Sequence, residues 1–303
     1  MRLLVDRSPN TGIIEGVSKL FSKELSLELF RKMCFVRNFE RYIEQIYTPE
    51  IFKPPLYLSV GQEAVDAALS LSFTKPKIFA QHRCHGIYLS YGADPRALVD
   101  ELLGLPTGCA KGMGGSASIH SPEINMDGHD GFMGTQIPIA VGHAMATGKK
   151  TLAVMGDASV EEGFVLEALG FAATKKPPVL FVCTDNGLSC LTPTCVRRNW
   201  NTVEHATFGM PAVEITDDPW LIMYWVQQFE QRLPAFINIQ TCRESSHANF
   251  IKDWLITPEW NRYQLVKNEL EHLGLGCHIP FVEESTEEQV KGLWQSRLEA
   301  SRG

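Results

Sequence analysis

The sequence predicts an α/β fold in which a parallel sheet is flanked by helices. Two apolar runs, at residues 152–155 and 179–183, have the length and composition of buried strands. Between them, residues 159–175 place apolar side chains at helical spacing, and Pro177 and Pro178 end that helix. A strand, a helix and a second strand in this order form a right-handed unit with parallel strands. Both strands should therefore end at the same edge of the sheet.

The composition is that of a soluble globular chain. The 303 residues, 44% hydrophobic and 21% charged, suffice for one large α/β domain or two small ones. A net charge of −7 argues against general nucleic-acid binding, which requires a basic face. No apolar run approaches the roughly 20 residues that span a bilayer, and the first residues lack a secretory pattern. We therefore expect a cytoplasmic protein without nucleic-acid or membrane partners.

The cysteines predict no metal site. The chain has 8 of them, with no C-x-x-C pair and no other zinc spacing. Several lie in apolar runs. Because no export signal is evident, we expect buried free thiols rather than disulfides or metal ligands.

Helical and strand patterns continue along the rest of the chain. Apolar residues recur every three or four positions across residues 24–47, which predicts a long amphipathic helix. Asp217 and Asp218 precede Pro219, which is a typical helix start. By the same criteria we expect helices at residues 61–72, 95–103, 140–148, 220–233 and 286–298, and strands at residues 78–80, 213–215 and 235–240.

Polar residues follow both strands of the first predicted unit. Asp157 leaves one strand and Asn186 the next, at the edge where open α/β sheets bind their ligands. A carboxylate and an amide oxygen suit a magnesium ion that bridges a diphosphate. The alternative is that both residues only form turns. Ser159, with Glu162 three residues later, predicts a capping box at the helix start.

Arg83 follows the strand predicted at residues 78–80. A guanidinium just beyond a strand end can fork onto phosphate oxygens, and the neighbouring His82 and His85 could add donors. The alternative is a surface turn with an ion pair.

Two further stretches are less informative. Five glycines between Gly104 and Gly115 allow the backbone to approach a ligand or another chain closely, but they also suit a mobile loop. Lys111 is the only charge there and no ATP-binding P-loop is present, so a phosphate cradle has weak support. Beyond Thr194, Arg197 and Arg198 lie in a segment with few apolar residues, where we expect a flexible active-site loop.

Longer motifs carry a resemblance to a known family. Gly-Asp at 156–157, followed by Asn186 at an offset of 29, resembles the thiamine diphosphate signature. The segments VGQEA (60–64), GCAKGMGGS (108–116) and GHDGFMGTQIP (128–138) are similar to the alpha chain of the thiamine-dependent, decarboxylating component of 2-oxo acid dehydrogenase complexes. The resemblance runs in order from about Leu27 to Ala248.

The resemblance implies a fold, cofactors and site residues. It implies a thiamine diphosphate-binding fold with Mg²⁺ held by Asp157, Asn186 and the carbonyl of Leu188. We then expect an N-terminal arm at 1–22, the cofactor-binding domain at 23–255 and a helical tail at 256–303. The expected cofactor contacts are Arg83, His82, Gly131, Met133, Gly156, Ala158 and Ser159, and the expected catalytic residues are His247 and His85. The alternative for Met133 is core packing, and both roles can hold together.

The resemblance also implies an enzyme that needs a second chain. The family's beta subunit supplies the catalytic glutamate across an interface in an α2β2 heterotetramer. Such a pair decarboxylates a 2-oxo acid, with pyruvate as the expected substrate, and passes the acyl unit to an acceptor such as lipoyl.

Several positions depart from the family pattern. Ala158 replaces a usual glycine, and alanine at positive φ would cost about 1 kcal/mol. Residues 244–246 differ from the usual turn before His247, Ser118 replaces a usual histidine, and the tail is short.

These departures leave other functions open. One is biosynthetic acyl transfer to a carrier protein or to an aldehyde, and another is a half-transketolase. A non-catalytic scaffold is a third, of a different class. The retained Asp157, Asn186, Arg83 and His247 argue against the scaffold.

Overall fold

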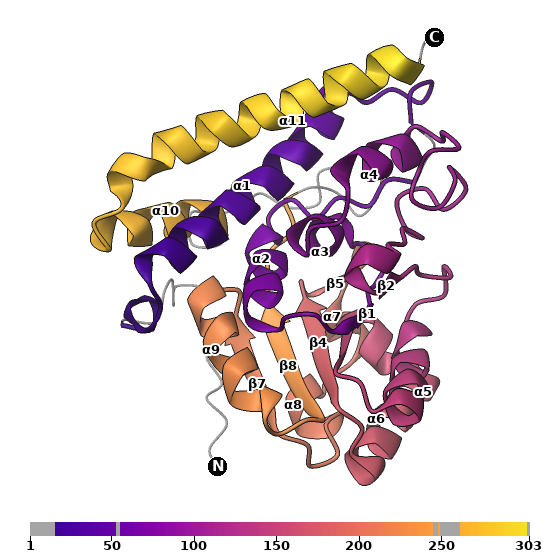
Figure 1. Cartoon of the computed structure of the whole chain (residues 1–303). Helices are drawn as coiled ribbons and strands as arrows, with labels where there is room; N and C mark the ends of the chain where they lie inside the picture. The colour runs from indigo at the N-terminus through magenta and orange to yellow at the C-terminus, as the bar shows by residue number, and fades with distance from the viewer. Residues whose placement is uncertain (1–15, 53–54, 245–247, 249–260, 302–303) are drawn as a thin grey trace.

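A six-stranded parallel sheet forms the centre of the protein. The computed structural model describes residues 16–52, 55–244, 248 and 261–301 (Figure 1). The strand order is β2-β1-β3-β4-β8-β7. These strands are β1 (Lys77–Phe79), β2 (Met126–Asp127), β3 (Thr151–Gly156), β4 (Val179–Asp185), β7 (Ala212–Thr216) and β8 (Ala235–Gln240). A separate antiparallel pair consists of β5 (Leu188–Ser189) and β6 (Thr192–Pro193).

The two strands of the first predicted unit are the adjacent parallel pair β3 and β4, which confirms the predicted α/β class. Along β3, Leu152 and Val154 join the core on one face of the sheet, whereas Ala153 and Met155 join the core on the other. Side chains of a strand alternate between the two faces, so a strand covered on both sides must be apolar throughout. This is why the sequence there is a continuous apolar run.

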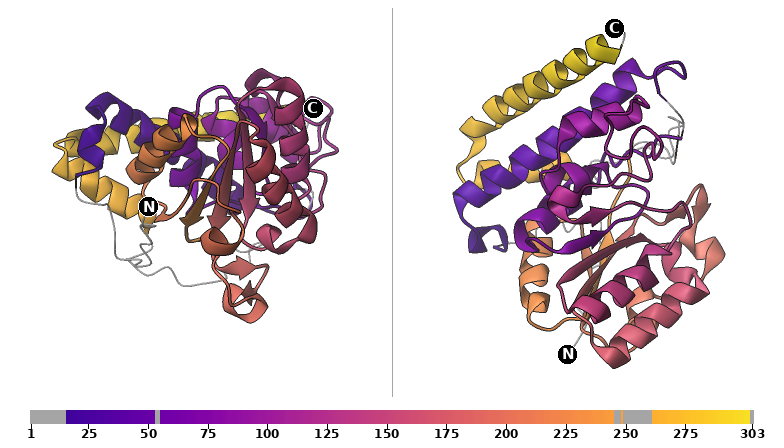
Figure 2. Two further views of the ribbon diagram at one scale, coloured as in Figure 1. Left: turned by 90° about the horizontal axis from the view of Figure 1, so that it is seen from below. Right: turned by 45° about the vertical axis from the view of Figure 1, so that its right-hand side comes forward.

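Helices cover both faces of the sheet (Figures 1 and 2). One face carries α1 (Lys23–Ile46), α2 (Glu63–Ser72), α3 (His85–Ser90), α4 (Pro95–Leu102), α9 (Pro219–Glu230), α10 (Arg262–His272) and α11 (Ile279–Ser301). The other carries α5 (Gln136–Thr147), α6 (Gly163–Lys175) and α8 (Thr202–His205), while α7 (Thr194–Arg197) follows β6. Short 3-10 turns are η1 (Ser18–Leu20), η2 (Pro122–Ile124), η3 (Ser159–Glu161) and η5 (Gly276–His278).

The predicted helices are present with shifted ends, and the short helices α3, α7 and α8 were not predicted. The predicted capping box is wrong. Ser159 begins the 3-10 turn η3, and α6 begins only at Gly163 after Glu162, which makes no side-chain cap. Glu162 is in the extended region, so it separates the two helical segments. The capping geometry cannot form across this break.

The glycine-rich segment is held by one buried carboxylate. Oε2 of Glu101 accepts hydrogen bonds from the backbone N–H groups of Ala110 and Gly112, at 2.6 and 2.8 Å. Its Oε1 accepts from Gly114 and Gly115, at 2.8 and 3.0 Å. These amides are therefore occupied by a side chain of α4. The glycines serve close packing on Glu101, and the plain mobile loop considered from the sequence is not what forms.

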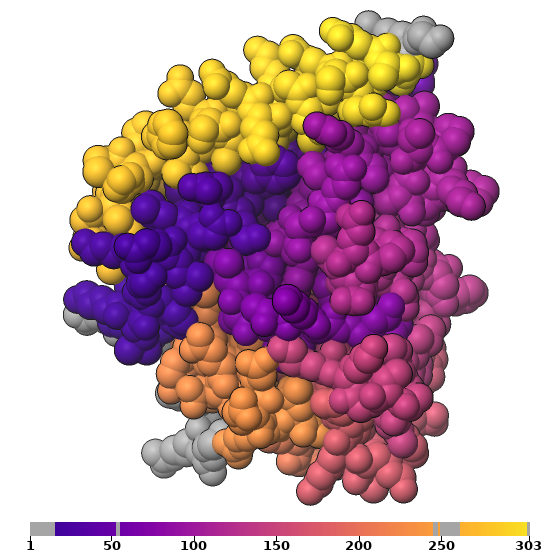
Figure 3. Space-filling view, in the orientation of Figure 1, coloured from indigo at the N-terminus to yellow at the C-terminus, as the bar shows by residue number. Residues whose placement is uncertain are grey.

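The C-terminal helices pack along the first helix. α11 lies along α1, and Figure 3 shows it covering that helix. The ring of Trp294 lies 5.2 to 5.9 Å from the rings of Phe39, Tyr42 and Phe52. Arg297 forms two 2.6 Å hydrogen bonds to the carboxylate of Asp100 in α4. In the described residues no helix is long and apolar enough to cross a membrane.

Candidate active site

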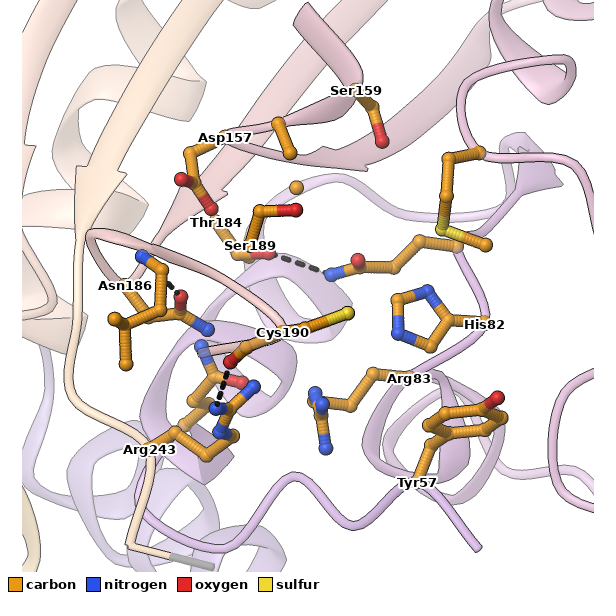
Figure 4. Close-up of a pocket in the computed structure, with 16 residues that line it drawn as sticks. Tyr57, His82, Arg83, Asp157, Ser159, Thr184, Asn186, Ser189, Cys190 and Arg243 are labelled. Carbon is orange, nitrogen blue, oxygen red and sulfur yellow. Dashed lines mark hydrogen bonds between the residues drawn. The ribbon is translucent and has the colours of Figure 1, made fainter. Parts of the chain in front are cut away.

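A cavity of about 180 Å³ opens at the carboxyl ends of β1, β3 and β4 (Figure 4). The chain leaves β1 toward β2 and leaves β3 toward β4, on the opposite side, so the strand order reverses between β1 and β3. Open α/β sheets bind ligands at such a reversal, because the flanking loops diverge there. The predicted site residues that line the cavity are His82, Arg83, Met133, Gly156, Asp157, Ala158, Ser159, Asn186 and Leu188.

Asp157 is buried, and its carboxylate is held on one side. Its Oδ2 accepts a hydrogen bond from Thr194 Oγ1 at 3.0 Å and another from the guanidinium of Arg197. Burial, and then the neighbouring Asp185 carboxylate, raises the pKa of Asp157 to about 6, while Arg197 acts in the opposite direction. Below about pH 6, a proton and a cation would compete for this group.

Asn186 and Leu188 form the turn that follows β4. The side-chain oxygen of Asn186 accepts from the N–H of Leu188 at 3.1 Å, which fixes the turn beside the cavity. An amide oxygen has two lone pairs and can also face a cation. The described residues contain no group of three or more His, Cys, Asp or Glu side chains that could hold a metal. A magnesium ion here would therefore need phosphate and water oxygens to complete its shell.

Two guanidinium groups face the cavity. Arg83 donates to the carbonyl of Leu58, and Arg243 donates to the carbonyl of Cys190 at 3.3 Å. A guanidinium presents its donors in a planar fork that matches the oxygens of a phosphate group. Gln62 also lines the cavity, and its buried Nε2 has no hydrogen-bond partner in the described part of the chain. This charge and these donors fit a diphosphate.

The two histidines next to Arg83 have different places. His82 lines the cavity, and its ring meets that of Tyr57 edge-on at 4.7 Å. His85 is fully buried outside the cavity lining, with Nδ1 3.1 Å from Glu40 and Nε2 2.9 Å from Ser116. The hydroxyl of Ser116 accepts from the N–H of Tyr57 at 2.9 Å. His85 thus braces a loop of the cavity, and this geometry favours a positioning role over the catalytic one expected.

The residues expected at the ring end of the cofactor lie near the surface. Gly131 is exposed and its N–H donates to Nδ1 of His129 at 2.9 Å. Burial lowers the pKa of His129, so its ring is neutral and can accept this bond. Met133 lines the cavity but is 38% exposed, and Phe132 is 74% exposed. His247, the other expected catalytic residue, lies outside the described residues.

The strain predicted at Ala158 does not occur, and that prediction is wrong. Its backbone has φ −71° and ψ −30°, in the right-handed helical region that alanine prefers. The chain enters the 3-10 turn η3 directly after Asp157, so no positive φ is required. Ala158 lines the cavity, and the buried Ser159 follows it with its hydroxyl directed into the space (Figure 4).

Some cavity residues were not singled out from the sequence. Gln81 follows β1 and donates to Thr184 Oγ1 at 2.6 Å, and Arg243 follows β8. Both stand just beyond strand ends, so the argument used for Asp157 could have found them. Gln62 belongs to the family motif at residues 60–64, which was given no ligand contact, and no local pattern indicates a ligand contact at Tyr57.

The comparison with known families agrees with this geometry. A family model described as "Dehydrogenase E1 component" matches residues 31–249. The chain belongs to this family. Its relatives include the pyruvate dehydrogenase E1 component subunit alpha of Zymomonas mobilis, 32% identical over 75% of this chain and 68% of the relative. The chloroplastic subunit alpha-3 of Arabidopsis thaliana is 35% identical over 69% of this chain and 54% of that relative.

A third relative matches a longer part of this chain than these two. The mitochondrial pyruvate dehydrogenase E1 alpha subunit of Saccharomyces cerevisiae is 26% identical over 89% of this chain and 67% of its own length. The alignments thus span about half to two thirds of the relatives. The resemblance expected from the motifs is confirmed, and the chain is an E1 component of the alpha type. This family depends on thiamine diphosphate with magnesium.

Proposed function

We propose that this chain is the alpha subunit of a two-chain thiamine diphosphate-dependent enzyme that decarboxylates a 2-oxo acid, with pyruvate as substrate. One observation carries the proposal. Asp157 and Asn186 leave neighbouring parallel strands and line the same cavity as Arg83. Two oxygen donors for magnesium beside a guanidinium for phosphate match the charged end of this cofactor.

In this proposal, one group of cavity residues binds the cation and the diphosphate, and another group contacts the organic rings. Asp157, Asn186 and the Leu188 carbonyl would hold the cation, and Arg83 with Ser159 would donate to the diphosphate. Met133, Gly131 and His82 would contact the organic rings. The bound cofactor supplies the electron sink for decarboxylation. The protein's share is to orient the reacting centre and exclude water.

The proposed enzyme requires a beta subunit. Among the described residues, Asp157 is the only acidic residue that lines the cavity, and it is assigned to the cation. The acid that acts on the cofactor ring must then come from elsewhere. Exposed Phe132 and Met133 at the ring end suit contact with a second chain. We propose that the partner supplies a glutamate there, in an α2β2 assembly.

The proposal also names an acyl acceptor and a cellular compartment. We assign lipoyl as the acyl acceptor, because the chain belongs to the E1 family and the strain at Ala158, one of the departures that left a biosynthetic enzyme open, does not occur. We assign the cytoplasm as the compartment. All eight cysteines are free, and three of them are buried, which suits a reducing environment.

The first prediction tests the cation ligands. In the chain assembled with its beta partner, Asp157→Ala and Asn186→Ala should each lower thiamine diphosphate affinity at least 100-fold at fixed magnesium concentration, because each removes one of two side-chain ligands. Calorimetric titration measures the affinity, and 2-oxo acid decarboxylation is assayed in parallel. The exposed Glu288→Gln is the control. Unchanged affinity in either variant would assign that residue to turn formation alone.

A further inference from the structure

The segment after β6 bonds to both halves of the proposed cation site. The side chain of Thr194 donates to Oδ2 of Asp157 at 3.0 Å. The backbone N–H of Thr194 donates to the carbonyl of Gly187 at 2.9 Å, and Gly187 lies between Asn186 and Leu188. One residue thus ties the carboxylate that follows β3 to the turn that follows β4. The sequence indicated no such link, because Thr194 lies 37 positions beyond Asp157.

Arg197 completes this arrangement. Its Nη2 donates to Oδ2 of Asp157 and, at 2.9 Å, to the hydroxyl of Thr194. Its Nη1 forms an ion pair with Glu161 in the 3-10 turn η3, at 2.9 Å. The side chains of Arg197 and Asp157 are only 13% and 4% exposed. Arg197 is therefore a buried guanidinium held from two sides, where a flexible loop was expected.

The contacts distinguish the two oxygens of Asp157. Both donors bond to Oδ2, and within the described part of the chain no hydrogen bond reaches Oδ1. A carboxylate with one oxygen fixed by two donors cannot rotate about its Cβ–Cγ bond without losing them. Ligating carboxylates are commonly held in this way, and the holding groups tune metal affinity.

We propose that Thr194 and Arg197 are positioning residues that hold Oδ2 of Asp157, so that Oδ1 faces the divalent cation. The proposal rests on the proposed function, because it takes Asp157 as a cation ligand. Thr194 also links the two ligands, because its backbone N–H bonds to Gly187 in the turn that holds Asn186. The positive charge of Arg197 offsets part of the negative charge of the neighbouring carboxylates of Asp157, Asp185 and Glu161.

A competing role for Arg197 predicts an opposite result. If the guanidinium only occupied the carboxylate in place of the cation, or only repelled the cation, its removal would strengthen cation binding. If it positions Oδ1, its removal weakens binding despite the loss of a positive charge. The sign of the change therefore decides between the two roles. Thr194 is neutral, so replacing it tests positioning without any change of charge.

The second prediction measures cation affinity directly. Mn²⁺ replaces Mg²⁺, and free Mn²⁺ is followed by its electron paramagnetic resonance signal in the assembled two-chain protein with saturating thiamine diphosphate. Thr194→Val should weaken Mn²⁺ binding about 10-fold or more, as is typical when a partner of a ligating carboxylate is lost. Thr194→Ser keeps the hydroxyl and should stay within about 3-fold of wild type. Arg197→Gln should also weaken binding.

The controls separate the possible outcomes. Cys195→Ser changes an exposed residue of the same helical turn and should leave Mn²⁺ affinity unchanged. Raising the Mn²⁺ concentration should restore the decarboxylation rate of Thr194→Val, because only cation affinity is impaired. Wild-type or tighter binding by Thr194→Val and Arg197→Gln, while Asp157→Ala binds no Mn²⁺, would overturn the positioning role alone. Absence of cofactor-dependent Mn²⁺ binding in wild type would overturn the proposed function and this proposal with it.

Discussion

Asp66 is a buried carboxyl with an unusual environment. Burial raises its pKa well above the ordinary range, and the carboxyl groups of Glu40 and Glu63 add to the effect. It lies against the start of α3, where a Cβ on Gly86 would come within 1.8 Å of its Oδ2. Glycine is required at that position because the helix backbone packs directly on the carboxyl. Burial also raises the pKa of Cys84 and of Tyr91, and the carboxyl of Asp66 adds to both shifts.

This environment makes stability depend on pH, which is the third prediction. The folded-state pKa of Asp66 exceeds its unfolded value, so the folded state binds the extra proton. The resulting stabilisation is complete below about pH 4 and is lost as the pH rises from there through the folded pKa, by at most about 1.4 kcal/mol per pH unit. Asp66→Asn cannot ionise, so it should gain stability relative to wild type between pH 5 and 7.5. Thermal unfolding midpoints of both proteins, measured across this pH range, test the prediction. It would be contradicted if the midpoints of wild type and Asp66→Asn changed with pH in parallel.

At the scale of elements, one side chain organises the glycine-rich segment. The four backbone amides bonded to Glu101 belong to residues 110–115, so a single carboxylate holds both ends of this segment. This contact explains the glycines without any phosphate. Gly108 illustrates the packing, since a Cβ there would lie 2.6 Å from Glu101.

The fourth prediction concerns this contact. Glu101→Gln keeps the shape of the side chain but turns one acceptor oxygen into a donor, which would face two N–H groups. Each buried amide left without a partner costs about 1–3 kcal/mol, so the variant should unfold at a clearly lower temperature. Amide hydrogen exchange of residues 110–115 should rise well above that of wild type. The exposed Glu288→Gln is the matched control, and normal protection in Glu101→Gln would show that the glycines hold the loop unaided.

At the scale of the whole molecule, the C-terminal helices complete the larger of the two cores. Trp294 of α11 is fully buried between the aromatic side chains of α1 and the following segment. The same core extends through α2 and α9 to the sheet. No residue of α11 lines the cavity. The described part of the tail and the expected cofactor-binding domain share this core. We therefore propose that the arm, the domain and the tail differ in function but do not fold as separate units.

The fifth prediction separates stability from binding. Trp294→Ala should destabilise the protein by about 3–5 kcal/mol, as large core truncations do. Trp294→Phe should cost less, because the indole N–H has no partner in the described part of the chain. Thiamine diphosphate affinity of the folded fraction should stay within about 3-fold of wild type in both. Denaturant unfolding and calorimetry measure the two quantities, and a large loss of affinity in Trp294→Phe would mean that the tail acts on the site.

The sequence by itself determined the longer helices and strands and the edge of the sheet at which the site lies. Apolar periodicity is a local property, so β3, β4 and the long α1 could be predicted from the residues within them. The parallel order of β3 and β4 follows from chain handedness, and it places Asp157 and Asn186 at one edge.

Only the tertiary structure decided which side chains meet. His85 lies only two positions beyond the cavity residue Arg83, yet the start of α3 directs its ring to Glu40 and Ser116. The backbone of Ala158 takes the helical region because a 3-10 turn follows, which no residue type there requires. Contacts such as Thr194 with Asp157 join residues far apart in the chain. They depend on how the packed elements orient each side chain, and that information is not present in any local stretch of sequence.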